Sequence, residues 1–265
     1  MKLLLIQEIL SMWVKPKIIT ISPNINLMLK ACDKASKVII RDFGEIENLQ
    51  VSKKGPNDFV TKTDKRVEKI LIEELTKSKK NYSFITEETG KIINKNKDVF
   101  WIIDPIDGTT NFLHGIPHFA ISIALQIEGE INCGLIFDAI KNEFFFAEKN
   151  NGSFINKNRI RVSKKINIDD CLFASNNEGV KSIYPKLNLR NTGCAALDLA
   201  YVACGRFDGY FHNAINLWDV AAGKIIIEEA GGLVNNIKGY EINNIDFRAA
   251  NPNIYEKMIK KLNNF

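Results

Sequence analysis

The stretch WIIDPIDGTTNF, from Trp101 to Phe112, decides how the chain is interpreted. It begins with an apolar run that is typical of a buried strand, and it then places Asp104 and Asp107 three residues apart at the end of that strand. Burying a carboxylate costs on the order of several kcal/mol unless a cation or hydrogen bonds compensate its charge. The two acids therefore predict a cation site or, as the alternative, aspartates that cap a turn.

The residues around these aspartates fit a cation site as well as a capped turn. Pro105 is expected to interrupt the hydrogen-bond ladder and to stiffen the end of the strand. Gly108 permits a tight turn that lets the backbone approach an anion, while Thr109 and Thr110 supply hydroxyl groups. Oxygen ligands without thiolates or clustered imidazoles favour magnesium over zinc. The stretch thus predicts a hard-cation site beside a phosphate cradle.

Two further acidic segments could contribute to the same site. FITEETG places Glu87 and Glu88 after a short apolar run, and INLWDVAAG places Asp219 at the expected start of a helix. For either segment alone, a helix cap or a solvated acidic pair is the favoured interpretation. The spacing from residue 87 to residue 219 does not by itself show that these acids converge.

The composition is that of a globular protein with one large domain or two small ones. The 265 residues are 45% hydrophobic, and 36 basic residues against 31 acidic ones give a formal charge of +5 without a long basic block. The five cysteines are odd in number and contain no C-x-x-C pair, which argues against a disulfide framework or a zinc site and favours a reducing cytoplasm. We expect residues 1–21 to be an amphipathic or disordered extension, or the result of a start codon placed too early, because the run Leu3–Ile6 is too short for a signal peptide.

Apolar periodicity predicts the main elements. Helices are expected over 24–43, 63–77, 194–204 and 218–230, and the segment KKGPNDFVT before the second of them is expected to be a turn followed by a short extended piece. A strand is expected over 101–104, and the alternating runs of 118–156 predict an antiparallel meander. No stretch reaches the ~18 apolar residues of a transmembrane helix. Helices and sheets are therefore expected to alternate in layers.

Taken together, the motifs resemble the inositol monophosphatase family. WIIDPIDGTTNF and LWDVAAGKIIIEEAGG look like its two signature segments, and KGPNDFVTKTD, FITEET and TGCAALDLAYVACGRFDGYF match in the same order along the chain. The resemblance is closest to the bacterial SuhB-like branch and covers about residue 22 to the C terminus. It implies one phosphatase domain over 22–265 with an αβαβα sandwich fold, a homodimer, lithium sensitivity, and two or three magnesium ions per site.

The resemblance also implies roles for individual residues. The family's magnesium ligands match the side chains of Glu87, Asp104, Asp107 and Asp219 and the backbone carbonyl of Ile106. Thr109 matches the threonine that positions the attacking water, and Asp64 matches the acid that hydrogen-bonds this threonine, so that Thr109, Asp64 and Glu87 form the catalytic set. The implied substrate contacts are Asp107, Gly108, Thr109, Gly193, Cys194, Ala195 and His212. Lys53 matches a basic position near the metal loop, where a surface lysine is an equal alternative.

One residue departs from the family pattern. Seven residues before Asp219, where many inositol monophosphatases carry a glutamate that hydrogen-bonds the inositol ring, this chain has His212. An imidazole both donates and accepts hydrogen bonds, and it can gain charge near neutral pH. This puts the alcohol part of the substrate in doubt, so myo-inositol 1-phosphate leads a set that includes other sugar, polyol and histidinol phosphates.

Two other functions stay open. Within the superfamily, the chain could hydrolyse fructose bisphosphate or an adenosine phosphate. In another class, it could be a regulatory protein that binds RNA or a transcription partner through its basic surface. A cysteine-phosphatase mechanism is disfavoured, since Cys194 is followed by AALDLAYV and the expected H-C-x5-R loop is absent. His114 and His118 are separated by Gly115 and Pro117, which favours loop or packing roles over metal binding.

Overall fold

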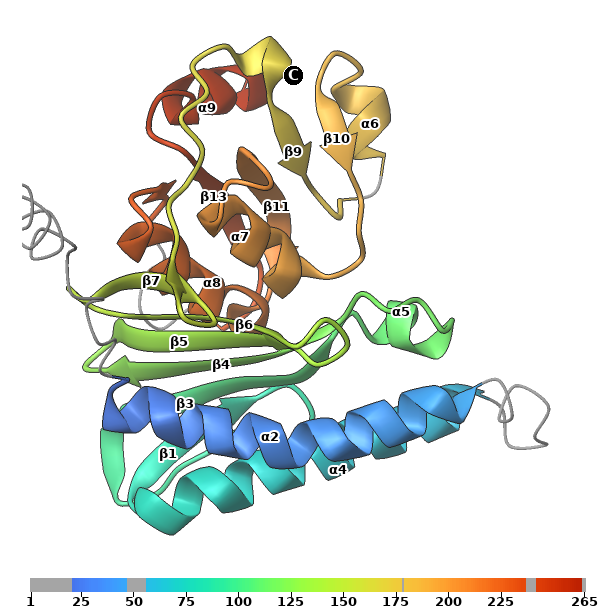
Figure 1. Cartoon of the computed structure of the whole chain (residues 1–265), viewed down its shortest axis with the longest axis vertical. Helices are drawn as coiled ribbons and strands as arrows, with labels where there is room; N and C mark the ends of the chain where they lie inside the picture. The colour runs from blue at the N-terminus through green and yellow to red at the C-terminus, as the bar shows by residue number, and fades with distance from the viewer. Residues whose placement is uncertain (1–20, 47–55, 178, 237–241, 264–265) are drawn as a thin grey trace, which may run out of the picture.

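The computed structural model describes residues 21–46, 56–177, 179–236 and 242–263, with only the backbone path given for 56–61. These residues form five layers in which helices and sheets alternate (Figure 1). The predicted αβαβα sandwich is therefore confirmed. Within the described ranges, no helix is both long enough and apolar enough to span a bilayer. All but the last residue of the expected extension 1–21, and Lys53 as well, lie outside the described residues.

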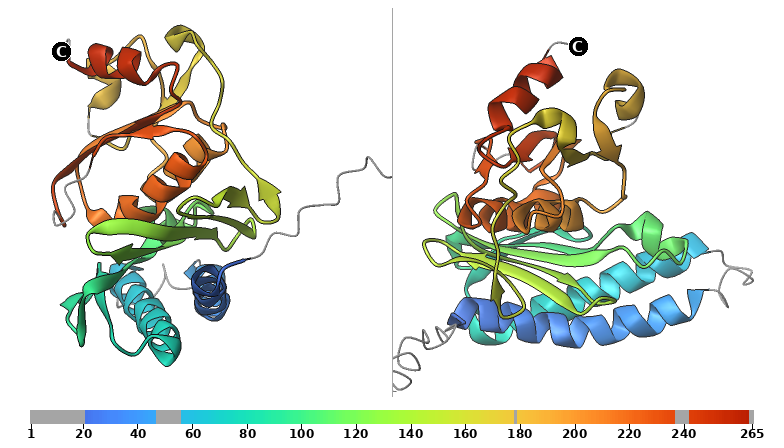
Figure 2. Two further views of the ribbon diagram at one scale, coloured as in Figure 1. Left: turned by 90° about the vertical axis from the view of Figure 1, so that its left-hand side faces the viewer. Right: turned by 45° about the horizontal axis from the view of Figure 1, so that its top comes forward.

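The first layer consists of the long helices α2 (Pro23–Gly44) and α4 (Pro56–Ser78), which lie under one face of the large sheet (Figure 2). α2 begins where predicted, because the Ser22 hydroxyl accepts the Ile25 N–H at 3.3 Å and proline occupies the first turn. α4 begins at Pro56, so the expected turn and extended piece before residue 63 were wrong. Proline is tolerated in a first helical turn, and it therefore did not mark a break here.

The large sheet has eight strands in the order β2-β1-β3-β4-β5-β6-β7-β8. Its central strand β3 (Asn96–Asp107) pairs in parallel with β1 (Tyr82–Thr86) and antiparallel with β4 (Ala120–Ile127). The expectation that the strand stops at Asp104 was wrong, because β3 continues through Pro105 to Asp107. Its register with β4 shifts between Asp104 and Asp107, so the proline occupies an irregularity where a ladder bond is not needed.

The predicted meander is confirmed as antiparallel neighbours in sequence order. It comprises β4, β5 (Glu130–Asp138), β6 (Glu143–Glu148) and β7 (Gly152–Ile155), and the two-residue strand β8 (Asn158–Arg159) extends it. The other edge of the sheet is formed by β2 (Gly90–Ile92), which turns back on β1. Alternating side chains of these strands face α2 and α4 on one side and the middle helical layer on the other.

The middle layer holds α7 (Ala195–Ala203) and α8 (Leu217–Glu229), within one or two residues of the predicted bounds. It separates the large sheet from a second sheet with the strand order β10-β9-β11-β13-β12. These strands are β9 (Leu172–Ala174), β10 (Asn188–Arg190), β11 (Gly209–Ile215), β12 (Leu233–Val234) and β13 (Ile245–Ala250). The outer layer contains α6 (Val180–Ile183) and α9 (Tyr255–Asn263) (Figure 1). Two short helices, α5 (Thr109–Leu113) and η1 (Ile168–Asp170), lie in connections.

Helix α8 packs unusually close to the large sheet, and this contact fixes its first turn relative to β3. A Cβ atom at Gly134 of β5 would lie 2.8 Å from the Ala222 Cα atom and 2.8 Å from the Ile225 Cγ2 atom. The backbones of β5 and α8 are therefore in direct contact at this point, with no side chain of Gly134 between them. Both partners are buried in the central core, so neither can move outward without opening that core.

We expect Gly134→Ala to lower the free energy of unfolding by about 1–3 kcal/mol, because the added methyl group forces α8 away from the sheet. Gly44→Ala is the matched control, since a Cβ atom at Gly44 meets nothing within 4 Å. Urea unfolding of both variants measures the difference. Equal stability of the two variants would contradict the close contact.

Candidate metal centre and active site

Three carboxylates from two elements meet at the end of β3. Asp104 and Asp107 come from β3, and Asp219 lies in the first turn of α8. One carboxylate oxygen of each residue lies within 4.8 Å of the others. Asp104 is only 1% exposed, so this charge is removed from water. The convergence that the sequence could not establish is thus present for these three acids.

Backbone N–H groups hold the three carboxylates in place. The Ile106 N–H donates to Asp104 Oδ1 at 3.0 Å, and the Asn216 N–H donates to Asp219 Oδ2 at 3.1 Å. Asp107 Oδ2 accepts the Ala196 N–H from the first turn of α7. The positive ends of two helix dipoles, α7 and α8, therefore face the acidic cluster. These contacts orient the carboxylates but do not neutralise all three charges.

Glu87 joins the cluster from the turn after β1. It is an exposed residue overall and is not one of the three acids whose oxygens lie within 4.8 Å of one another, but after burial its charge is the largest effect that raises the Asp104 pKa. The turn is held by Glu68 of α4, which is 1% exposed and accepts the Glu88 N–H at 2.9 Å and the Thr89 hydroxyl. Sequence reasoning missed Glu68. An acid inside the apolar stripe of a helix was the signal that could have found it.

Burial and mutual repulsion both raise the pKa values of these four acids. Burial is the main cause, and it raises the pKa of Asp107 to about 6, those of Glu87 and Asp219 to about 7, and that of Asp104 well above its usual range. Mutual repulsion adds to this, since each of these acids feels the negative charge of at least one other. A divalent cation among the carboxylates would relieve both penalties. The donors are all oxygen atoms, which fits a hard cation such as magnesium.

The glycine-threonine turn lies directly beside this cluster. Gly108 has a φ of 92°, and a Cβ atom there would lie 3.0 Å from the His118 carbonyl oxygen, so the turn requires glycine. The Thr109 hydroxyl donates to the Ile106 carbonyl at 3.0 Å. This is the carbonyl that the family resemblance assigns to magnesium, so it already has one partner here.

The expected hydrogen bond between Asp64 and Thr109 is not formed among the described residues. Asp64 of α4 is 3% exposed, and its Oδ1 atom has no hydrogen-bond partner. Burial, followed by the charges of Glu88, Glu87 and Glu68, raises the Asp64 pKa to about 8. The Thr109 hydroxyl instead donates to the backbone carbonyl of Ile106, three residues earlier in the same turn. Such local hydrogen bonds to the backbone are common for threonine. The prediction that Asp64 orients Thr109 therefore does not describe this state of the protein.

The predicted sugar-side segment borders the same turn. Gly193, Cys194 and Ala195 lead into α7, and the Cys194 thiol donates to Asp107 Oδ2 at 3.2 Å. Cys194 is fully buried, and burial together with the Asp107 charge raises its thiol pKa well above the usual range. The thiolate needed for a cysteine nucleophile is thus strongly disfavoured, in agreement with the sequence analysis.

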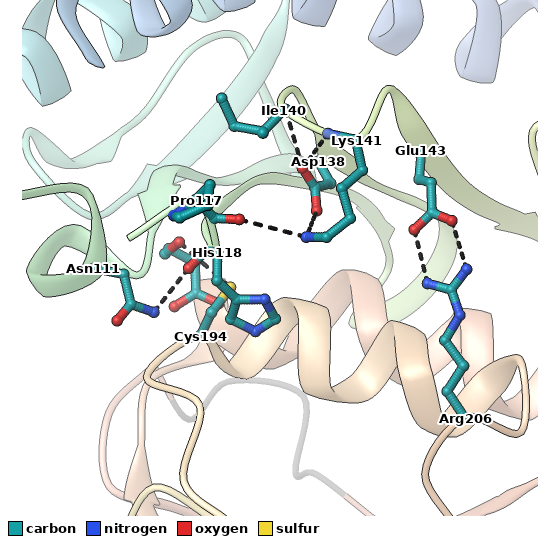
Figure 3. A network of polar contacts seen from close by, with 10 residues as sticks. Asn111, Pro117, His118, Asp138, Ile140, Lys141, Glu143, Cys194 and Arg206 are labelled. Atoms are coloured by element: carbon teal, nitrogen blue, oxygen red, sulfur yellow. Dashed lines mark hydrogen bonds and ion pairs between the residues drawn. The ribbon is translucent and has the colours of Figure 1, made fainter. Parts of the chain in front are cut away.

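Asn111 joins the two segments and was missed from the sequence. Its Nδ2 atom donates to the carbonyl oxygens of His118 and Thr192, each at 2.8 Å, and so ties the glycine-threonine turn to the sugar-side loop. Figure 3 shows Asn111 beside Cys194, with the neighbouring Pro117 carbonyl held by Lys141. Lys141 also donates to the buried Asp138 at 2.6 Å. The far end of the loop after α5, at Pro117 and His118, is therefore held by two separate side chains.

The His118 ring has a packing role, as expected from the sequence. Its centroid lies 6.0 Å from that of Tyr201 in an edge-to-face arrangement. Burial and the neighbouring Lys141 charge lower the His118 pKa, which favours the neutral ring. Among the described residues, His118 does not belong to the candidate metal-binding group that Asp104, Asp107 and Asp219 form at the end of β3.

Asp198 and Asn176 form a second support that sequence reasoning missed. Asp198 is fully buried in α7 and accepts the Thr192 hydroxyl at 2.7 Å and the Asn176 Nδ2 at 3.2 Å. Asn176 in turn accepts the N–H groups of Thr192 and Gly193 at 3.2 and 3.0 Å. These bonds fix the sugar-side loop from behind. The acid within the apolar helix AALDLAYVA was the available signal.

His212 lies on β11, where its ring contacts Tyr210. Its Nδ1 atom is 3.2 Å from the Tyr210 hydroxyl. Tyr210 is fully buried, and its pKa is raised first by burial and then by the charges of Asp198, Asp107 and Asp219. Burial and the charge of Arg248 lower the His212 pKa, so its ring is favoured in the neutral form. The hydrogen bonds of the described residues thus link the His212 ring to Tyr210 and not to the three acids.

We expect the free energy of unfolding of the EDTA-treated protein to fall as the pH rises from about 4 to about 8. Glu87, Asp64, Asp107 and Asp219 all have pKa values raised to between about 6 and about 8 by folding. Over that interval the folded state binds more protons than the unfolded state, so stability is present at low pH and is lost on ionisation. Urea titrations at several pH values measure the decline.

The matched control is the same series with saturating Mg²⁺, which should make the decline smaller because the cation replaces the protons. Metal-free Asp104→Asn should also lose less stability with pH, since one buried acid is gone. A stability that rises between pH 4 and pH 8 without metal would contradict the assigned repulsion.

The comparisons with known proteins agree on one family. The inositol monophosphatase family matches residues 21–264. An inositol-1-monophosphatase of Mesorhizobium japonicum is 39% identical over 251 residues, which cover 89% of this chain and 94% of that protein. The Nus factor SuhB of Pasteurella multocida is 38% identical over 259 residues, covering 91% of this chain and 96% of that protein. The crystal structure of the extragenic suppressor protein suhB from Bartonella henselae has a TM-score of 0.81 and 37% identity, covering 91% of this chain and 100% of that one. The chain therefore belongs to the inositol monophosphatase family.

Proposed function

We propose that the protein is a magnesium-dependent phosphomonoesterase that hydrolyses a small phosphorylated polyol or sugar, with myo-inositol 1-phosphate as the first candidate. The convergence of Asp104, Asp107 and Asp219 beside the Gly108 turn carries this proposal. It gives a phosphate ester a cation site and a backbone turn at one place. Family membership and the printed name of the Mesorhizobium relative support the same activity.

The acids of the cluster would hold the metal. We assign Glu87, Asp104, Asp107 and Asp219 as side-chain ligands and the Ile106 carbonyl as a backbone ligand. Bound magnesium would supply charge neutralisation for the phosphate and the leaving alkoxide, and it would make water acidic enough to act as the nucleophile. The resemblance also implies that lithium inhibits the enzyme and that two or three magnesium ions bind per site.

Thr109 and Asp64 would prepare the attack on phosphorus. The Thr109 hydroxyl, no longer bonded to the Ile106 carbonyl, would accept a hydrogen bond from the attacking water and donate a hydrogen bond to the Asp64 carboxylate. Asp64 Oδ1 is buried and without a partner, which is the state of an acceptor that awaits a donor. The cost of leaving it unpaired, typically about 1–3 kcal/mol, supports a role in a second, substrate-bound arrangement.

The alcohol part of the substrate would face the loop before α7. We assign Gly193, Cys194, Ala195 and His212 to this side, and Asp107, Gly108 and Thr109 to the phosphate side. Because the Nδ1 atom of His212 lies at the Tyr210 hydroxyl, a neutral ring offers the substrate only Nε2, which can donate a hydrogen bond if it carries the proton, whereas a glutamate only accepts. A hydroxyl group of the substrate that accepts a hydrogen bond is therefore favoured at this position.

We further propose a cytoplasmic location and, from the family resemblance, a homodimer. The five cysteines are all free thiols, which suits a reducing compartment. The names of some relatives contain the words Nus factor, and a regulatory role in transcription is the second candidate. The intact acidic cluster favours catalysis as the first.

We expect Asp104→Asn to reduce magnesium-dependent phosphate release by about 10³-fold or more, because one buried ligand charge is lost. The matched control is Asp98→Asn, which changes an exposed acid near the other end of the same strand and should retain full activity. The assay uses myo-inositol 1-phosphate, fructose bisphosphate, adenosine phosphates and histidinol phosphate. Folded, magnesium-bound protein that releases no phosphate from any of them would refute the proposal and direct attention to a transcription partner.

We expect Glu68→Gln to raise the magnesium concentration for half-maximal activity by about 10–100-fold, because the turn that presents Glu87 loses its charged acceptor. Glu73→Gln, an exposed acid on the same helix, is the control. Steady-state rates over a magnesium series measure the shift. An unchanged magnesium dependence would show that Glu68 does not position the ligand.

A further inference from the structure

A cavity lies in the outer part of the fold, on the face of the small sheet that is turned away from the acidic cluster. It has a volume of about 360 Å³ and opens between α6, the end of β11, β13 and the end of α9. Phe211 and Asn213 line it, whereas the alternate residues Tyr210 and His212 of the same strand point toward the middle layer. The cavity is therefore separate from the candidate metal centre.

Arg248 brings a positive charge to this cavity without an acidic partner. It lies on β13 opposite Phe211 and is half-buried. No carboxylate forms an ion pair with it within the described part of the chain. Its Nη1 atom donates to the carbonyl oxygens of His212 and Phe247 at 2.7 and 2.9 Å, and its Nη2 atom donates to Asn213 Oδ1.

The guanidinium group has donors left over. Arginine carries five N–H bonds, and the three contacts above use three of them. The Nε–H and the second Nη2–H of Arg248 find no acceptor among the described residues. A half-buried guanidinium with two unused donors is suited to a carboxylate or phosphate group, which can accept two hydrogen bonds at once. Burial is the largest effect on the Arg248 pKa and lowers it, while the nearby Asp246 charge, which forms no ion pair with the guanidinium among the described residues, raises it in part.

The remaining walls of the cavity are apolar and amide groups. Phe211 and Tyr184 meet edge to face with ring centroids 5.6 Å apart, and Val180, Ile183 and Leu262 add aliphatic surface. The Asn177 Oδ1 atom accepts the Asn213 N–H at 3.1 Å. A wall of mixed amide and apolar groups around one charged group suits a small organic anion with a polar head and an apolar body.

We propose that this cavity binds a small organic anion, in which a carboxylate or phosphate group pairs with Arg248 and an apolar or aromatic body contacts Phe211 and Val180. The volume, near the lower end for ligand pockets, suits a molecule of roughly ten to fifteen heavy atoms. The site is distinct from the phosphatase centre, and binding there does not require the metal.

The same arginine connects the cavity to His212. Arg248 fixes the His212 carbonyl, and the following residues depart from a regular strand, with Ala214 at a φ of 56° and a register shift between His212 and Ile215. An anion that draws the guanidinium toward itself changes the contacts that hold this segment. Occupancy of the cavity therefore alters the surroundings of the His212 ring on the opposite face.

The test uses metal-free protein in EDTA, so that the acidic cluster cannot recruit the probe through a cation. The probes are 3-phenylpropionate and phenylphosphonate, with neutral 3-phenylpropionamide as the control, and methyl NMR of Val180, Ile183 and Leu262 reports occupancy. We expect the two anions to shift these methyl signals with a Kd on the order of 1 mM, and the stronger of the two identifies the preferred head group. The amide should bind about tenfold more weakly or not at all.

Two sets of variants keep the result interpretable. Arg248→Gln should weaken binding of the anions about tenfold, and a thermal melt checks that it is folded. Ile183 is 47% exposed, so Ile183→Asp and Ile183→Asn should both fold, and only the aspartate should repel the probe. Anions that bind Arg248→Gln and Ile183→Asp as tightly as wild type, or that leave the methyl signals unmoved up to about 10 mM, would overturn the proposed site.

The connection to His212 has its own readout, which does not depend on activity. The chain has three histidines, and a His212→Gln variant assigns the His212 ring protons. These signals should move with the same Kd as the cavity methyls. Ring signals that stay in place while the methyls shift would refute the connection.

Discussion

The repulsion among buried carboxylates at the end of β3 is the constraint on which the other features of the site depend. Asp104 is almost fully enclosed, and Asp107, Asp219 and Glu87 approach it from β3 itself, from α8 and from the turn after β1. Without a cation, burial and mutual charge push their pKa values upward, so the folded state holds protons that the unfolded chain would release. A protein keeps such an arrangement only where a function requires it, and a divalent cation converts the repulsion into binding.

The five layers bring these acids together from distant parts of the sequence. β3 lies in the middle of the large sheet, while α7 and α8 direct their first turns at its end, and the close contact of α8 with Gly134 sets the position of Asp219. Behind the acids, Glu68 holds the Glu87 turn and Asp198 holds the sugar-side loop. Each of these supports is a buried acid that accepts hydrogen bonds from backbone, hydroxyl or side-chain amide donors, so the site is positioned by groups that do not themselves belong to the cluster.

Local patterns predicted much of this arrangement, and non-local contacts account for the rest. The bounds of α2, α7 and α8 and the order of the meander follow from apolar period, caps and turns, and the motifs identified the acids through the family they resemble. The start of α4 at Pro56 and the passage of β3 through Pro105 were missed, because proline was interpreted as a break where the tertiary context tolerates it. The sequence carries no local signal for contacts between residues that lie tens of positions apart. Such contacts determine the strand order of the small sheet, the hydrogen bond from Asn111 to Thr192 and the position of Arg248 beside His212. The Thr109 hydroxyl donates to the Ile106 carbonyl and not to Asp64, and the spacing of residues in the sequence does not predict which of these two acceptors it uses.

The central claim is that the acids at the end of β3 exist to hold divalent cations beside a phosphate. Its most direct measurement is the anomalous diffraction of crystals equilibrated with Mn²⁺ and inorganic phosphate, because manganese accepts the same oxygen ligands as magnesium and scatters anomalously. The account predicts anomalous peaks within about 2–2.5 Å of carboxylate oxygens of Asp104, Asp107 and Asp219, with phosphate density at the Gly108 turn. Well-ordered carboxylates with no peak among them at saturating Mn²⁺, or manganese bound only elsewhere on the protein, would contradict it.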